Sequence, residues 1–184
     1  VDSFGAVTMA AFAAAVKIDS FAYLPVQDFG NAFSTFTAQN YGAGQSSRIK
    51  EALKKATILS DAFSSAAAAA VFIFAEPLMR IFVSASETEV IAAGVRYLHI
   101  EGVFYAGIGC LFLLYGLYRA LGKPGMSVVL TVISLGTRVA LAYLLSAIPA
   151  IGVTGIWWSV PIGWGLADLA GSLYYKARKP ESLA

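Results

Sequence analysis

The sequence predicts an all-helical membrane protein, a polytopic bundle of about five transmembrane helices. Hydrophobic residues make up 58% of the 184 positions and charged residues 13%, whereas ordinary soluble domains have roughly 45–50% and about 25%. The apolar residues form long blocks rather than helix faces or alternating strands, and basic residues gather in alternate connections between these blocks. All three observations indicate that lipid is the solvent of most of the chain.

Five segments are long enough to cross a bilayer. Crossing about 30 Å of hydrocarbon takes roughly 20 apolar residues in a helix, because each backbone amide must bond within its own segment. The first and third segments exceed this length, which predicts tilt, a kink or extension beyond the bilayer, and Pro25 is the expected kink in the first. If the first segment lies on the membrane surface instead, four helices span. The segments are residues 6–39, 56–83, 88–121, 125–148 and 152–175.

The basic residues predict the orientation of the chain. Nine of the 13 Lys and Arg residues lie at or after the ends of the first, third and fifth segments, whereas the connections at 84–89 and 146–152 contain no Lys or Arg. By the positive-inside rule, the C-terminus and a short tail at 176–184 are cytoplasmic and Val1 is outside, in an inner or plasma membrane. The odd number of spans and the absence of an initiator Met lead us to expect a truncated chain that lacks its N-terminal part. The nine basic residues are Arg48, Lys50, Lys54, Lys55, Arg119, Lys123, Lys176, Arg178 and Lys179.

Several function classes find no support in the sequence. The net charge of +2 is too small to indicate nucleic acid, and the single cysteine, Cys110, allows no disulfide framework and no cysteine-based metal site. No phosphate-binding loop, zinc-ligand pair or nucleophile elbow occurs. We therefore expect neither an enzyme nor a bound cofactor.

The first segment is too polar for a helix that faces only lipid. Gln27, Asp28 and Asn31 occupy neighbouring sectors of one helical face, and we predict that they line a cavity. Aromatic residues lie between them, and carboxylates with aromatic faces suit organic cations. The alternative is that these polar groups bond to adjacent helices. Lys17 and Asp19 are interpreted as interfacial. The aromatic residues are Phe21, Tyr23, Phe29, Phe33 and Phe36.

The third and fourth segments each carry a deep charge. Glu101 and Arg138 fall near mid-depth in antiparallel neighbours, and we include both in the predicted cavity. An ion pair between them is favoured, and a proton-carrying Glu101 is the alternative. His99 is interpreted as a packing residue, and Asp168 as bonded to a neighbouring helix.

Three motifs resemble those of the multidrug and toxic compound extrusion (MATE) transporters. FTAQNYGAGQ at 36–45 resembles the Gln-Asn-x-Gly-Ala-Gly signature that ends the second and eighth helices of that family. YGLYRALG at 115–122 resembles the end of the tenth helix, and GIWWSVP at 155–161 the opening of the twelfth. The three occur in register with five spans, and the similarity covers nearly the whole chain.

The resemblance implies that the chain is helices eight to twelve of a two-lobed, twelve-helix carrier, and that its partner is the N-terminal lobe. The family exchanges organic cations for incoming protons or sodium ions by alternating access. Members with a cation site in this lobe use an acidic residue on the seventh helix and an aspartate at the position of Ile108, so Glu101 is a candidate replacement. The alternatives are a lipid-linked oligosaccharide flippase of the same superfamily and a structural subunit that transports nothing.

Overall fold

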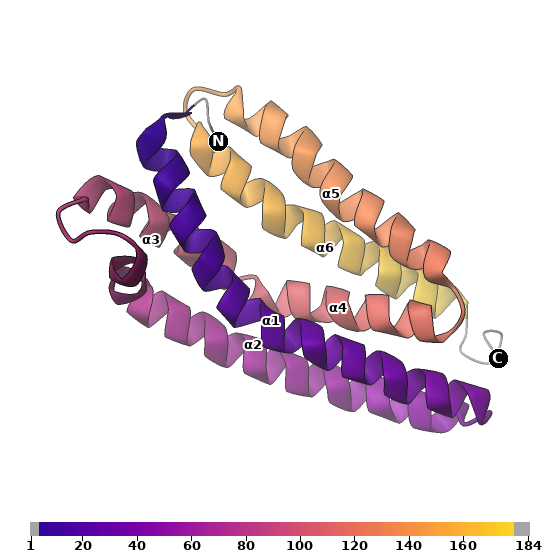
Figure 1. The fold of residues 1–184 in the computed structure, drawn as a ribbon. Helices are drawn as coiled ribbons and strands as arrows, with labels where there is room; N and C mark the ends of the chain where they lie inside the picture. Colours follow the sequence, from indigo (N-terminus) through magenta and orange to yellow (C-terminus); the bar gives the residue numbers. More distant parts are fainter. Residues whose placement is uncertain (1–3, 179–184) are drawn as a thin grey trace.

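The computed structural model describes residues 4–178 of the chain, and this part is helical throughout its regular structure (Figure 1). The all-helical class expected from the sequence is confirmed. Residues 4–178 form six α-helices, because the third expected segment is divided in two. They are α1 Ala6–Gly42, α2 Ser46–Phe82, α3 Thr88–Gly102, α4 Tyr105–Ala120, α5 Pro124–Ser146 and α6 Val153–Ala177.

The third segment bends by 53° between α3 and α4. Gly102 ends α3, and Phe104 leaves helical geometry with φ −106° and ψ 12°. The Phe104 amide donates to the Glu101 carbonyl at 2.9 Å, so a tight turn replaces the regular helical bond. A glycine at this point lowers helix propensity, which explains why an apolar stretch of this length does not form one straight helix.

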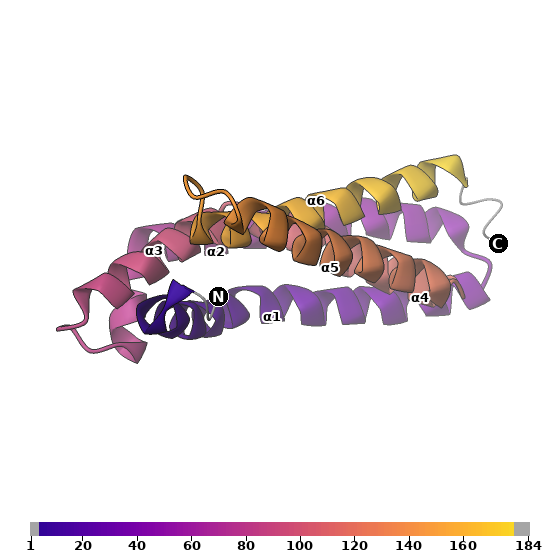
Figure 2. The ribbon, with the colours of Figure 1, turned by 90° about the horizontal axis from the view of Figure 1, so that it is seen from above.

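Two other helices also bend. Figures 1 and 2 show α1 changing direction along its length, and Pro25 is the proline inside this helix. Proline has no amide hydrogen and clashes with the preceding turn, as the sequence led us to expect. In α2 the backbone departs from helical geometry at Phe74, three residues before Pro77. We did not predict this second kink, although the same argument applies.

The helix boundaries differ from the predicted spans at several ends. The second helix starts at Ser46 rather than 56, because residues 46–55 form charged, amphipathic first turns of the helix, with Ile49 buried and Lys55 paired to Glu51. The last helix runs to Ala177, so the expected tail at 176–184 begins inside it, and 179–184 lie outside the described residues.

We predicted five membrane spans, but fewer helices are both long enough and apolar enough to cross a bilayer. Within residues 4–178, α1, α2 and α5 are long and apolar enough, and the bent pair of α3 and α4 makes a fourth candidate. The last helix has 25 residues, but its tryptophans, tyrosines and glycines make it less apolar. Such aromatic residues are typical of the membrane interface.

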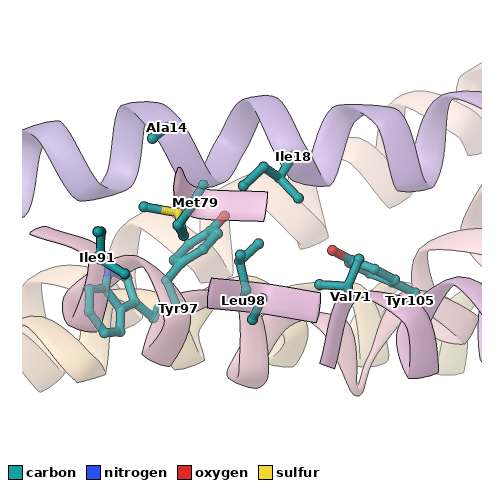
Figure 3. Close-up of a cluster of buried hydrophobic side chains, with 11 residues drawn as sticks. Ala14, Ile18, Val71, Met79, Ile91, Tyr97, Leu98 and Tyr105 are labelled. Atoms are coloured by element: carbon teal, nitrogen blue, oxygen red, sulfur yellow. The ribbon is translucent and has the colours of Figure 1, made fainter. Parts of the chain in front are cut away.

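The broken pair α3 and α4 contacts the helices on both sides of the bundle. Figure 1 shows α1 and α2 along one side and α5 with α6 along the other, with α4 between them. The first two helices pack on both α3 and α4, whereas α5 packs mainly on α6. Figure 3 shows the apolar core where α1, α2 and α3 meet, with Met79 and Leu98 fully buried in it.

Glycines permit the closest helix contacts. A Cβ at Gly116 would lie 2.6 Å from the Gly30 carbonyl oxygen, and one at Gly163 would lie 2.6 Å from the Ser134 carbonyl oxygen. These two glycines therefore allow backbones to approach closely. Gly165, by contrast, has no atom within 4 Å of such a Cβ.

Candidate functional site

Two carboxylates are buried together inside the bundle. Glu101 is 0% exposed and Asp19 is 6% exposed, and their charges interact. Carboxylates are costly to bury away from water, and inside a membrane protein they usually mark a functional position. This pair is therefore the strongest candidate site in the described part of the chain.

The backbone explains how these groups meet. Tyr97 and Glu101 are four residues apart on α3, so they share one face of the helix. Tyr105 begins α4 just after the break, and α1 packs on both α3 and α4. Asp19 therefore faces the point at which the broken span changes direction.

Tyrosine hydroxyls surround the Asp19 side chain. The Tyr105 hydroxyl donates a hydrogen bond to Asp19 Oδ1, and Tyr97 is the second hydroxyl that interacts with this carboxylate. Figure 3 shows both tyrosine hydroxyls directed toward α1 in the region of Ile18, the neighbour of Asp19. Hydrogen bonds from hydroxyls compensate in part for the lost hydration of a carboxylate.

Glu101 has no such compensation. Both of its side-chain oxygens are buried and neither has a hydrogen-bond partner. The indole nitrogen of Trp157, whose ring packs edge-on against Tyr97 at 5.8 Å, is also buried without a partner. The site thus contains two free acceptors and, in the same apolar cluster, one free donor.

The ion pair predicted between Glu101 and Arg138 is wrong. Among residues 4–178 the ion pairs within 4.0 Å are Lys55 with Glu51 and Arg80 with Glu76, both on exposed surfaces. Arg138 is half-buried on α5 and acts on Glu101 only as a more distant charge. The physical reason is packing, because α5 lies against α6 and α4 while α3 contacts α1, α2 and α6.

The polar face predicted on the first helix lies elsewhere. Asp28 and Asn31 are exposed and Gln27 is half-buried. The Arg119 Nη2 donates to Asn31 Oδ1 at 2.9 Å, which joins this face to the end of α4. The described contacts do not place these three residues with Glu101, so the predicted set divides into an exposed face on α1 and a buried site behind it.

The aromatic residues of the first helix also divide. Phe33 is 5% exposed and belongs to an interior cluster with Leu113 and Leu117. Phe21 is 74% exposed. Only some of these aromatic side chains are therefore available to any ligand beside α1.

A second acidic group lies between α2, α4 and α6. Asp168 interacts with the Cys110 side chain and with the charge of Asp61, and its Oδ1 is buried without a partner. The interaction with Cys110 of α4 agrees with the expectation that Asp168 contacts a neighbouring helix. His99 also matches its interpretation as a packing residue, because its ring stacks on Phe72 at 4.1 Å and its Nε2 lies 3.1 Å from the Phe72 carbonyl oxygen.

The sequence reasoning missed Asp19, which we interpreted as interfacial. Asp19 lies thirteen residues inside α1, and at about 1.5 Å per residue this is roughly 20 Å from the start of the helix. That depth was a signal that could have identified it. Within residues 4–178 no group of three or more His, Cys, Asp or Glu side chains could hold a metal ion.

Comparison with known proteins gives a consistent result. The family model described as MatE matches residues 1–144. Among curated proteins, the chain is 30% identical over 177 residues to the probable multidrug resistance protein YpnP of Bacillus subtilis (strain 168), covering 96% of this chain and 39% of that protein. It is 28% identical over 173 residues to the FAD transporter of Shewanella oneidensis, covering 93% and 37% respectively.

Solved structures share the fold. A multidrug resistance MATE family transporter of the MOP superfamily in an outward-facing conformation superposes with a TM-score of 0.89 at 21% identity, covering 96% of this chain and 39% of that one. The MATE transporter ClbM in complex with Rb⁺ superposes with a TM-score of 0.85 at 25% identity, covering 96% and 41%. The chain thus spans about two fifths of the length of these relatives.

Proposed function

Because the chain belongs to the MATE family of membrane transporters, we propose that it forms one wall of the cavity of a carrier that exports organic cations and other xenobiotics. The observation that carries this proposal is the family match over residues 1–144. The carrier exchanges its substrate for protons or sodium ions by alternating access, in an inner or plasma membrane with the C-terminus in the cytoplasm. Its partners are the bilayer and the N-terminal lobe of the same protein.

The exposed polar face of α1 is the part of the chain that we propose as the cavity wall. Asp28 and Asn31 are exposed there, although a polar face on lipid would be unfavourable. A shallow groove of about 500 Å³ runs beside Asn31, and Ser34, Gln39 and Arg119 contribute to its lining. The charged residue of the groove lining is Arg119, and Asp28, three residues before Asn31 on the same helix, adds a negative charge nearby that attracts cationic substrates.

Neutralisation of carboxylates accounts for release. A substrate cation bound near Asp28 loses its electrostatic attraction when a proton or sodium ion compensates the carboxylate charge. Binding of the coupling ion then favours one of the two lobe arrangements over the other, and the difference in affinity between the two states drives transport. Asp28, Asn31 and Gln27 act on the substrate in this scheme, and Glu101 acts on the coupling ion.

A second candidate function is transport of an anionic dinucleotide. Its support is the FAD transporter of Shewanella oneidensis, which aligns with 93% of this chain at 28% identity. Arg119 lines the groove, and its positive charge would attract an anionic substrate. A lipid-linked oligosaccharide flippase needs a strongly cationic cavity, and the exposed Asp28 on the same helix face argues against it.

Efflux from cells tests the proposal. The full-length protein is expressed in a host lacking its main exporters, and ethidium, a flat organic cation, and exported FAD are measured in parallel. We expect lower ethidium accumulation than in the vector control, with FAD export unchanged. Asp28→Asn should weaken ethidium efflux, and Glu76→Gln, an exposed carboxylate of α2 paired with Arg80, is the matched control. Ethidium accumulation equal to the vector control would contradict the proposal, and FAD export alone would favour the second candidate.

A further inference from the structure

We propose that Glu101 and Asp19 form a buried site that holds one exchangeable proton at the break between α3 and α4. This inference rests on the proposed function, since it identifies the residues that couple ion movement to transport. It assigns the role to a position behind the cavity wall, separate from the exposed polar face of α1. It also differs from the position of Ile108, where the resemblance would place an acidic side chain.

The two buried carboxylates carry charge that the described part of the chain does not balance nearby. Two ionised carboxylates cannot share one buried site without a compensating charge, and the ordinary outcome is that one of them keeps a proton. No cationic side chain lies within 4.0 Å of either carboxylate among residues 4–178. The site therefore needs a proton or a bound cation from outside the chain.

The oxygen ligands available at the site favour a proton over a bound cation. Asp19 Oδ1 accepts a hydrogen bond from the Tyr105 hydroxyl, whereas neither Glu101 oxygen has a hydrogen-bond partner among the described residues, so Glu101 carries the unoccupied acceptors of the site. Sodium is a hard cation that requires several oxygen ligands, and one carboxylate supplies two. A proton needs a single oxygen, and the protonated carboxyl group can then donate to a neighbouring acceptor.

The surroundings limit what else can titrate at this site. Four titratable or charged side chains interact with the site from different helices. They are Asp19 of α1, Tyr97 of α3, Tyr105 of α4 and, as a more distant positive charge, Arg138 of α5. From α2 and α6 the neighbours are apolar or aromatic, including Val71, Met79 and Trp157 in the same cluster. His99 lies on α3 as well, but its ring is turned to Phe72.

The location explains how a proton could act on the conformation. Glu101 is in the last turn of α3, and its carbonyl accepts the bond from Phe104 that forms the turn. Tyr105, at the start of α4, holds Asp19 of α1. When the O–H bond of Glu101 breaks and the proton leaves to water, a second negative charge faces Asp19 across this break. Repulsion then favours opening the packing between α1 and the α3–α4 turn.

Transport by the purified full-length protein in liposomes tests the site with two readouts. Uptake of ethidium driven by an imposed pH gradient requires the exchangeable proton, whereas counterflow of ethidium against preloaded ethidium requires only substrate binding and the conformational cycle. Glu101→Gln mimics the protonated acid in shape and hydrogen bonding. We expect it to reduce gradient-driven uptake at least about tenfold and to leave counterflow within about twofold of the wild type.

Asp19→Asn provides an independent variant, and Asp28→Asn tests whether the effect belongs to the buried site. We expect Asp19→Asn to behave like Glu101→Gln, and Asp28→Asn to lower both readouts together. A carboxylic-acid carbonyl band in the infrared spectrum of the wild type should disappear in Glu101→Gln. This band can be measured even in a variant that transports nothing.

The outcomes separate this inference from the proposed function. Wild-type protein that transports no ethidium in either assay contradicts the proposed function, while the infrared band still tests the protonated carboxyl group. Gradient-driven uptake that persists in Glu101→Gln overturns the site. Uptake driven by a sodium gradient and lost in Glu101→Gln also overturns it, because the site would then hold sodium.

Discussion

Replacing Gly116 with alanine should destabilise the contact between α1 and α4. The new Cβ would lie 2.6 Å from the Gly30 carbonyl oxygen, and ordinary contact begins at 3.4 Å, so the two helices must separate locally by 3.4 − 2.6 = 0.8 Å. The Ser34 hydroxyl donates to the Gly116 carbonyl at 2.9 Å, and the same displacement takes this bond beyond the range of a hydrogen bond. Overpacking of this kind costs about 1–3 kcal/mol and the lost hydrogen bond about 1 kcal/mol.

The matched control is Gly165→Ala. Gly165 lies in α6, and a Cβ there meets no atom within 4 Å. Alanine is favoured over glycine in a helix by up to about 1 kcal/mol, so this variant should be neutral or slightly stabilised. Thermal unfolding of the full-length protein in detergent measures both. Equal midpoints for Gly116→Ala and Gly165→Ala would refute the reasoning from close helix contact.

Three further predictions concern single side chains in the full-length protein. Ser34→Ala should cost about 0.6 kcal/mol, typical of a hydrogen bond between membrane helices, and Thr35→Ala, whose hydroxyl bonds within its own helix, should cost less in the same thermal assay. Trp157→Phe should change stability by under about 1 kcal/mol because it removes an unpaired buried donor, whereas Trp157→Ala should cost about 3–5 kcal/mol; similar midpoints would contradict this. Asp28→Asn should raise the KM for ethidium by about tenfold while Glu76→Gln leaves it unchanged, and an unaltered KM in both would remove Asp28 from the cavity wall.

The fold class and most helix positions followed from the sequence because the governing physics is local. Apolar length sets a membrane helix, and Pro25, Gly44 and Gly122 mark a kink and two turns that a single sequence reveals. Gly44 and Gly122 have φ values of 68° and 69°, which favour glycine. A kink was one of the outcomes expected from the length of the third segment, but its position at Gly102 was not predicted because both halves are apolar, so no change in composition indicates it.

The candidate site was harder to predict because it depends on which way a helix faces. Asp19 and Asp28 are nine residues apart, and at about 100° per residue they point to opposite sides of α1. Asp19 is buried and Asp28 is exposed, as this geometry requires. The sequence shows that the two side chains lie on opposite sides of the helix, but it does not show which of these sides packs against the other helices.

The pairing of Glu101 with Arg138 failed for a related reason. Depth along a helix can be estimated from residue counts, and both residues do lie near the middle of their segments. Depth does not determine which helices are neighbours, and α5 packs on α6 rather than on α3. Only the three-dimensional arrangement shows that Asp19 replaces Arg138 beside Glu101.

Ethidium transport into liposomes by the purified full-length protein is the most direct test of the central claim. With a pH gradient as the sole driving force, we expect uptake that stops when the gradient is collapsed by a protonophore. Uptake should also be absent from liposomes without protein. No difference between liposomes with and without the protein, under either a proton or a sodium gradient, would contradict the assignment of this chain to an exporter of organic cations.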